Sequence, residues 1–216
     1  MFDGSEPTSC TIELTVSEQS DTHIDIDARI ASSNAQGKPV FHYAAKLRLS
    51  RDPLTAPRFE GELNPGQGTP AADCYRDGTL FHGESLQGLK TIVHCDEQQL
   101  QLRCLINASA AAKSGEFSLS QSNIFANDLV YQAMLVWVRK QHDMGSLPSA
   151  TGQWLMYREV HNAEPFDLLL QVNSFSRNQL LADIQLIDQN GWLIAEVKNA
   201  AVTASDNLKQ LFKPSK

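Results

Sequence analysis

An aspartate and a glutamine, Asp128 and Gln132, stand four residues apart in a long apolar stretch of the chain. If this stretch is helical, the two side chains lie one turn apart on one face, where the amide of Gln132 can hold the carboxyl group of Asp128. A carboxyl group held at the entrance to a buried helix can serve as a general acid or base. The alternative is that Asp128 is an acid of the first helical turn that only improves capping.

The element that must position this pair is a predicted helix within Asn123–Met144. Its apolar residues recur at helical spacing and cover almost the whole circumference: Leu129, Val130, Ala133, Met134, Leu135, Val136, Trp137 and Val138. A helix that is apolar all round is enclosed by other structure. We expect the helix to cover residues ~127–143, with Asn127 as its cap, Asp128 in its first turn and Gly145 after its end.

Segments with alternating apolar and polar residues precede and follow this helix, and they predict antiparallel strands. Three are expected at the start of the chain, at 11–16, 23–30 and 40–49, and a fourth at 99–106, after an ambiguous segment at 86–94. Four more are expected at 153–160, 166–172, 180–187 and 192–202, with a hairpin at Asp188–Gly191 between the last two. A long buried helix followed by antiparallel strands indicates an α+β hotdog fold, in which a sheet wraps around the helix.

A segment rich in proline and glycine, residues 52–73, divides the chain into two parts. We interpret residues 1–51 as the closing strands of a first, partial hotdog, 52–73 as a linker or irregular crossing, 74–204 as a second hotdog and 205–216 as a tail. The first part has strands but no helix of its own to enclose. The sequence therefore predicts an incomplete double hotdog.

The composition is that of a folded globular protein and argues against several classes of function. Of the 216 residues, 42% are hydrophobic and 20% are charged, and the formal net charge is -7. So acidic a chain argues against a nucleic-acid partner, and its apolar runs are too short to span a membrane. The cysteines show no zinc-binding spacing, so we expect free thiols and no metal site: Cys10, Cys74, Cys95 and Cys104. Free thiols and an N-terminus too polar for a signal peptide together favour a cytoplasmic location.

Four short motifs resemble those of polyketide synthase dehydratase domains, in the same order over ~130 residues. Residues 75–89, Y-R-D-G-T-L-F-H-G-E-S-L-Q-G-L, resemble the Y-x-x-x-x-L-F-H-G-P-x-F-Q-G-I stretch that opens the second hotdog of that family. Asp128–Gln132 is similar to its D-x-x-x-Q motif, and Leu147-Pro148 is similar to the L-P after its helix. Residues 183–191 are similar to its D-I-x-L-x-D-x-x-G hairpin.

Two positions of the first motif depart from the pattern, because Glu84 replaces proline and Leu86 replaces phenylalanine. These departures favour the divergent dehydratases that polyunsaturated fatty acid synthases carry. The resemblance implies a double hotdog that dehydrates 3-hydroxyacyl chains on acyl carrier protein, with neighbouring synthase domains as further partners. It implies no resident cofactor, since the phosphopantetheine arm arrives with the carrier protein. An incomplete first hotdog would also allow a homodimer.

The resemblance also implies a set of site residues. Asp128 matches the aspartate that protonates the leaving hydroxyl group, and Gln132 matches the residue that orients it. The residues expected to bind the substrate are Tyr75, Leu80, Phe81, His82, Gly83 and Phe125. A carboxylic acid stays protonated near neutral pH only in an apolar, partly dry site, so we expect Phe125, Leu129 and the strands of the sheet to enclose Asp128.

The catalytic histidine of the family has no match in this chain. It belongs to an H-x-x-x-G-x-x-x-x-P motif of the first hotdog, and none of the 6 histidines here has glycine four residues later. We expect this base to come from outside the chain; the alternative is that the acid–base pair has been lost. We interpret His82 as a structural or tunnel-lining residue, with a role as substitute base as its alternative.

Three functions are therefore open, in this order. The first is a dehydratase-type domain that acts on 3-hydroxyacyl thioesters. The second is a non-catalytic double-hotdog scaffold or acyl-chain-binding domain, which the absent histidine motif favours. The third is a hotdog thioesterase, which also uses an acid near the central helix but would release a free thiol.

Overall fold

The computed structural model describes residues 9–106, 123–161 and 163–211, and the chain divides into two units, Met1–Leu54 and Thr55–Lys216. The first unit is a three-stranded antiparallel sheet with the strand order β1-β2-β3. Its strands are β1 (Cys10–Gln19), β2 (His23–Ser33) and β3 (Pro39–Ser50). The three strands predicted at the start of the chain are therefore present, and each is longer than the sequence pattern indicated.

One face of the first unit is apolar, because the strands alternate apolar and polar residues. The register places Ile12 beside Ile30, and Ile30 beside Tyr43, in one row across the sheet. Large apolar side chains of this face are exposed: Ile12, Leu14, Val16, Tyr43, Leu47 and Leu49. No helix in the described part of this unit covers them.

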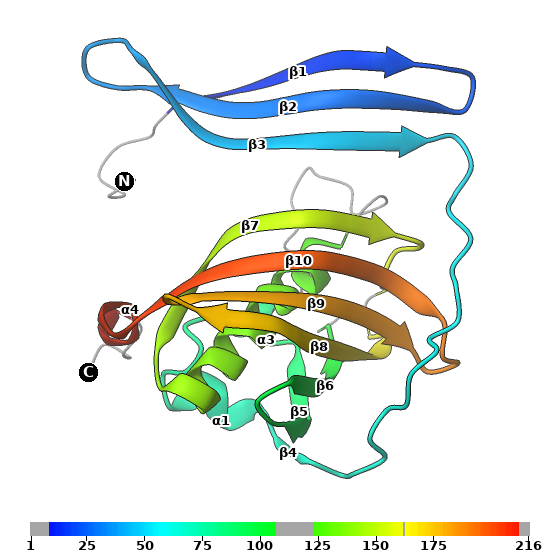
Figure 1. Ribbon diagram of the computed structural model, residues 1–216, viewed down its shortest axis with the longest axis vertical. Coiled ribbons are helices and arrows are strands. Elements are labelled where there is room, and N and C mark those ends of the chain that lie inside the picture. The colour runs from blue at the N-terminus through cyan, green and yellow to red at the C-terminus, as the bar shows by residue number, and fades with distance from the viewer. Residues whose placement is uncertain (1–8, 107–122, 162, 212–216) are drawn as a thin grey trace. The chain divides into compact units, whose positions relative to one another are not determined.

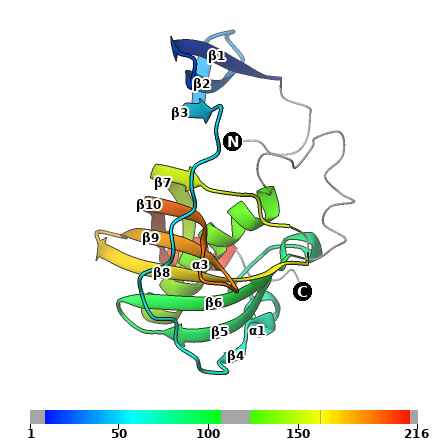
Figure 2. The same ribbon diagram turned by 90° about the vertical axis from the view of Figure 1, so that its right-hand side faces the viewer.

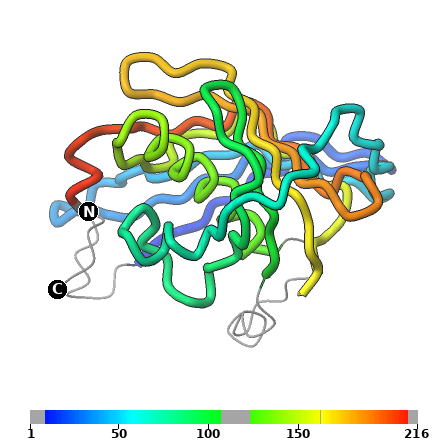
Figure 3. Tube along the Cα trace, turned by 90° about the horizontal axis from the view of Figure 1, so that it is seen from below, coloured from blue at the N-terminus to red at the C-terminus, as the bar shows by residue number. Residues whose placement is uncertain are grey.

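The second unit is a seven-stranded sheet that curls around one long helix, α3 (Ile124–His142) (Figures 1 and 2). In sheet order its strands are β4 (Thr69–Pro70), β5 (Leu89–Cys95), β6 (Gln99–Leu105), β8 (Pro165–Ser176), β9 (Gln179–Asp188), β10 (Leu193–Ser205) and β7 (Gly145–Met156). Among the described residues three short helices accompany them: α1 (Ala72–Arg76), the 3₁₀ helix η1 (Glu84–Leu86) and α4 (Asp206–Leu211). Seen from below, the turns of α3 lie along one face of the strands (Figure 3). This is the arrangement expected of an α+β hotdog fold.

Packing on all sides holds α3 in place, as its apolar circumference predicted. Leu129, Val130, Ala133, Met134 and Val138 have almost no exposed surface and belong to one core with the inner face of the sheet. Burial of each large side chain contributes about 1.5–3 kcal/mol to stability. The helix is therefore stabilised mainly by the sheet around it.

The helix begins earlier than predicted, and the prediction that Asn127 caps it was wrong. Asn123 is the cap, because its side-chain oxygen accepts hydrogen bonds from the backbone N–H groups of Phe125 and Ala126. Asp128 is consequently the fifth helical residue and lies beyond the first turn. The helix ends at Asp143, whose positive φ of 55° breaks the helical backbone two residues before the expected stop.

The strand predicted at 153–160 lies earlier, at β7, which starts directly after the helix. Pro148 lies within this strand, although proline lacks the N–H group that a sheet ladder needs. The strand order places β7 at the edge of the sheet, where one side of the strand needs no hydrogen-bond partner. An edge strand tolerates the proline at this position.

The segment predicted as a linker, residues 52–73, divides between the two units, and from Thr55 onward it packs with the second. Phe59 and Leu63 pack on a small apolar cluster on the outer side of the sheet, formed by Leu169, Ile187 and Leu193. Residues 69–70 form β4, which pairs with β5. Of the predicted tail, 206–211 form α4 and 212–216 lie outside the described residues.

Candidate functional site

The predicted pair meets on α3 as the spacing indicated. Gln132 Nε2 donates a hydrogen bond to Asp128 Oδ2 at 2.7 Å. Gln132 is 1% exposed, whereas the side chain of Asp128 is 33% exposed. The carboxyl group is thus held from the protein side and open to a ligand on the other.

His82 is the second partner of this carboxyl group. Its Nε2 atom lies 3.5 Å from Asp128 Oδ2, and its side chain is only 10% exposed. The ring stacks on Phe81, with 4.4 Å between the centroids, and the buried Nδ1 atom has no hydrogen-bond partner among the described residues. Burial lowers the pKa of His82, and the nearby charge of Asp128 offsets this only in part, so the imidazole is neutral at neutral pH.

A short relay of hydrogen bonds fixes Gln132 from the opposite side. Its Nε2 atom also donates to the backbone oxygen of Leu86 at 2.8 Å, and its Oε1 atom accepts from the Tyr75 hydroxyl at 2.7 Å. The Tyr75 oxygen in turn accepts from the backbone N–H of Leu89 at 3.1 Å. Burial raises the pKa of Tyr75, so its hydroxyl keeps its proton at all moderate pH values. Tyr75, expected to bind substrate, thus directs its hydroxyl group to Gln132.

The segment from α1 to β5 brings Tyr75 and His82 to the helix, and Gly88 allows the close approach. A Cβ atom at Gly88 would lie 2.7 Å from Leu129 Cδ1, which is closer than real contacts permit. Glycine therefore lets the backbone next to η1 rest against α3. This explains the position of a glycine in the sequence Gln87-Gly88-Leu89.

The other predicted substrate-binding residues lie in different environments. Leu80 and Phe125 are buried in the core that surrounds α3. The Phe81 side chain is 52% exposed and stacks on His82, and Gly83 precedes η1 at the surface. The structure thus joins Tyr75 and His82 to the predicted pair, while contact of all six residues with an acyl chain stays a prediction.

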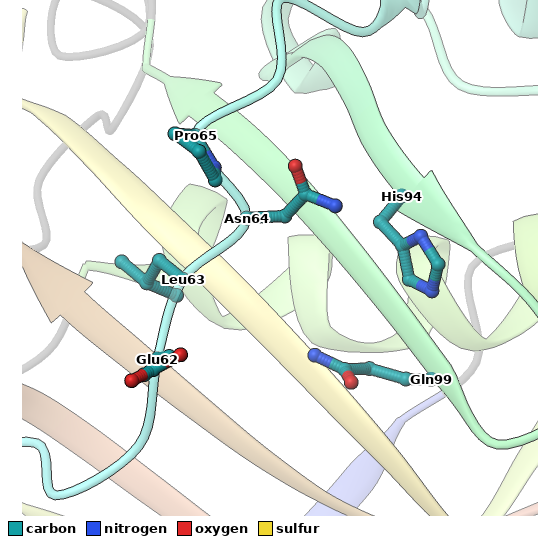
Figure 4. Close-up of a pocket in the computed structure, with 6 residues that line it drawn as sticks. All are labelled: Glu62, Leu63, Asn64, Pro65, His94 and Gln99. Carbon is teal, nitrogen blue, oxygen red and sulfur yellow. The ribbon is translucent and has the colours of Figure 1, made fainter.

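A surface depression of about 300 Å³ lies elsewhere, on the crossing segment that precedes β4 (Figure 4). Its lining residues are Glu62, Leu63, Asn64, Pro65, His94 and Gln99. His94 is paired with Asp96 at 2.8 Å. None of these residues belongs to the site around Asp128.

Three potential metal ligands approach one another in the first unit, which the sequence did not indicate. Atoms of Glu18, His23 and Asp25 lie within 4.8 Å of one another. Arg48, however, donates two hydrogen bonds to Asp25, at 2.6 and 2.7 Å, and thereby lowers the pKa of that carboxyl group. Since the guanidinium group already neutralises Asp25, we assign no ion to this group.

In the part of the chain that the structure describes, no helix is long and apolar enough to cross a membrane.

Comparison with known proteins gives consistent results. Residues 55–211 match the family model described as the polyketide synthase dehydratase N-terminal domain. The chain is 31% identical over 207 residues to one subunit of the polyunsaturated fatty acid synthase of Thraustochytrium sp. (strain ATCC 26185 / S-3). That match covers 93% of this chain but only 7% of the relative, so the chain spans a small part of that protein's length.

Solved structures of dehydratase domains share the fold. One is a trans-AT polyketide synthase dehydratase domain from Brevibacillus brevis, with a TM-score of 0.70 and 19% identity over 90% of this chain and 68% of that chain. Another is the dehydratase domain of PpsC from Mycobacterium tuberculosis in complex with C12:1-CoA, with a TM-score of 0.61 and 16% identity over 91% of this chain and 69% of that one. These neighbours confirm the predicted hotdog fold, and the family model matches most of the chain. The chain therefore belongs to the dehydratase family of polyketide and polyunsaturated fatty acid synthases.

Proposed function

We propose that this domain dehydrates 3-hydroxyacyl thioesters that acyl carrier protein presents within a multidomain fatty acid or polyketide synthase. The observation that carries the proposal is the hydrogen-bonded pair of Asp128 and Gln132, 2.7 Å apart on an enclosed helix. The pair matches the family's D-x-x-x-Q motif. The neighbouring synthase domains, the carrier protein, a homodimer and a cytoplasmic location are further parts of the proposal.

In the proposed reaction Asp128 is the general acid toward the hydroxyl group on the β-carbon. A base removes a proton from the α-carbon, the electrons of that C–H bond form the double bond, and the β-carbon–oxygen bond breaks. Hydroxide is a poor leaving group, so the oxygen departs as water once Asp128 has given it a proton. Gln132 and His82 both lie against Oδ2, which leaves Oδ1 to face the substrate.

The observed start of α3 supports the acid role. A helix dipole favours negative charge chiefly in the first turn, and an acid in that turn would hold its proton poorly. Asp128 lies one residue beyond that turn, because Asn123 is the cap.

We place the base in a histidine from outside this chain. None of the histidines in the sequence has the motif of the family's base. His82 is close enough to reach the same substrate, but burial lowers its pKa, and a histidine with a lowered pKa is a weaker base. We therefore assign His82 the role of a neutral partner that packs against the carboxyl group of Asp128.

The same proposal explains the first unit as the closing strands of a partial hotdog. Its apolar face carries side chains such as Ile12 and Tyr43 that a central helix would cover. The described chain covers only about two thirds of the solved dehydratase domains, 68% and 69% in the two above. Residues 74–204 would then be the second hotdog, which supplies the acid.

The second candidate function is a non-catalytic scaffold or acyl-chain-binding domain. The absent histidine motif favours it, because a lone acid cannot remove the α-proton. A hotdog thioesterase is the third candidate. These functions differ in product: a dehydratase releases water and keeps the thioester, a thioesterase releases a free thiol, and a scaffold does neither.

The test is the substitution Asp128→Asn in a protein that also contains the segment proposed to supply the histidine. Dehydration of a 3-hydroxybutyryl thioester, or hydration of a crotonyl thioester, is followed by the absorbance of the enoyl group, and free thiol is titrated in parallel. We expect dehydration to fall at least about a hundredfold, the usual loss when a general acid is removed.

The matched control is Asp206→Asn, which makes the same substitution at an exposed aspartate of α4 that takes no part in the site. It should retain the parental rate. An unchanged rate in the Asp128→Asn protein would remove Asp128 from the mechanism. Thiol release by the parent would favour the thioesterase, and the absence of any turnover would favour the scaffold.

A further inference from the structure

We propose that Tyr75 is a positioning residue for Asp128 and acts through Gln132. The inference rests on the proposed function, since it assigns Tyr75 to the machinery of that acid. It gives the Tyr75 hydroxyl group a role in addition to the substrate contact predicted for this residue. The direction in which each hydrogen bond of the relay points supports this role.

Two backbone groups at the ends of the relay determine that direction. The Leu89 N–H can only donate, and it donates to the Tyr75 oxygen at 3.1 Å. The Leu86 carbonyl can only accept, and it accepts from Gln132 Nε2 at 2.8 Å. The Tyr75 proton is therefore directed to Gln132 Oε1, 2.7 Å away, and the amide has its NH₂ group on the other side.

This arrangement excludes the flipped amide. In the flipped orientation the Gln132 oxygen would face two acceptors, the Leu86 carbonyl and Asp128 Oδ2, and the NH₂ group would face the Tyr75 hydroxyl. At least two buried groups would then lack a hydrogen-bond partner, and each such loss is unfavourable. Asp128 Oδ2 consequently always receives an N–H donor, and the carboxyl group keeps one orientation.

Burial makes the Tyr75 hydroxyl hard to replace. Gln132 is 1% exposed, so bulk water cannot reach Oε1 in place of the hydroxyl group. Without that donor, the amide keeps only its contacts on the NH₂ side and gains freedom to rotate. The orientation of Asp128 then becomes less well defined, which slows a proton transfer that depends on geometry.

The experiment is a double-mutant cycle in the intact protein with Tyr75→Phe, Gln132→Leu and the combination. Tyr75→Phe removes one oxygen atom and keeps the ring. We expect kcat for dehydration to fall about tenfold, the effect of one lost hydrogen bond, with KM changed less than about twofold. In the Gln132→Leu background Tyr75→Phe should lower kcat little further, because the amide group that the Tyr75 hydroxyl orients is already absent.

The matched control is Tyr131→Phe, which removes a hydroxyl group from the same helix as Gln132. Tyr131 is hydrogen-bonded to Thr151 and takes no part in the relay. A second readout needs no turnover: the side-chain amide protons of Gln132, observed by ¹H–¹⁵N NMR, should shift and exchange faster in Tyr75→Phe but not in Tyr131→Phe.

The outcomes separate this inference from the proposed function. Equal losses from Tyr75→Phe in both backgrounds, or a loss no larger than that of Tyr131→Phe, would overturn the relay. Unchanged Gln132 amide signals in Tyr75→Phe would also overturn it, even if Asp128→Asn is inactive. If the amide signals respond as expected while Asp128→Asn keeps full activity, the relay stands and the proposed function fails.

Discussion

At the scale of single residues, the site depends on a carboxyl group with neighbours from two parts of the sequence. Gln132 comes from the same helix, and the i, i+4 spacing predicted its contact with Asp128. His82 lies 46 residues before Asp128 in the sequence. The sequence showed only that His82 belongs to a motif that resembles the family's. Its 3.5 Å distance from Asp128 Oδ2 depends on how the segment before β5 folds against α3.

The buried state of His82 predicts a specific pH dependence of stability. A histidine in an unfolded chain has a pKa of about 6.5, and burial lowers the pKa of His82 in the folded protein. Its contribution is thus complete above about pH 6.5 and is lost as the pH falls toward the lower folded pKa, because the unfolded chain takes up the proton first.

We therefore expect the unfolding free energy of the parent to fall more steeply between pH 7.5 and 5 than that of His82→Gln, which carries no titrating group at this position. Urea unfolding of both proteins over this pH range, in steps of about half a unit, measures the difference. Identical pH dependence in the two proteins would contradict a buried, neutral His82.

At the scale of elements, the helix was predictable in kind but not at its first residue. Apolar residues around the whole circumference identified α3 and its burial. Two asparagines four residues apart, Asn123 and Asn127, both suit a cap by type. Tertiary contact distinguishes them, because the Asn123 amide also donates to the backbone oxygen of Val160 at 2.9 Å.

We expect Asn123→Ala to lower the unfolding free energy by about 1–2 kcal/mol, since it leaves the N–H groups of Phe125 and Ala126 without their acceptor. Asn123→Ser keeps a capping oxygen but not the bond to Val160, and it should lose less. Chemical denaturation of the three proteins measures both effects. A serine variant as unstable as the alanine variant would show that the contact with Val160, not the cap, is what matters.

At the scale of the whole molecule, the two units differ in whether the apolar face of their sheet is covered. The second unit encloses its helix and has an extensive core. The first unit has one apolar face, with side chains such as Ile12 and Tyr43 exposed. Monomeric soluble proteins rarely leave so large an apolar patch uncovered, which is the physical reason to assign it a covering element.

If a segment outside this chain covers that face, the 216-residue chain alone should bind the hydrophobic dye ANS while folded. The double substitution Ile12→Ser and Tyr43→Ser should reduce the dye fluorescence at least about twofold, since both residues lie in one row of that face. The control is Glu13→Ser with Lys46→Ser, on the opposite face of the sheet, which should leave the dye fluorescence unchanged. Equal fluorescence in all three proteins would show that the face is already covered.

The sequence by itself determined the class of fold and the family. Three patterns are local: the alternation along the strands, the all-apolar helix and the Asp188–Gly191 hairpin. Local patterns can be recognised from the sequence alone, because they involve only residues that are close in the chain. The hairpin is present, with Gly191 at a φ of 81° that glycine adopts readily. The four-residue spacing of Asp128 and Gln132 is local in the same sense.

Only the tertiary structure decided the start of α3, the place of β7 at an edge where Pro148 is tolerated, and the hydrogen-bond partner of the Tyr75 hydroxyl group. Each depends on contacts that are remote in the sequence: Val160 for the cap, the strand order of the described sheet for β7, and Gln132 for Tyr75, 57 residues away. Residue spacing cannot encode such contacts, because they form only when the sheet closes around the helix. The direction of the hydrogen bonds at Asp128 is therefore a property of the folded chain.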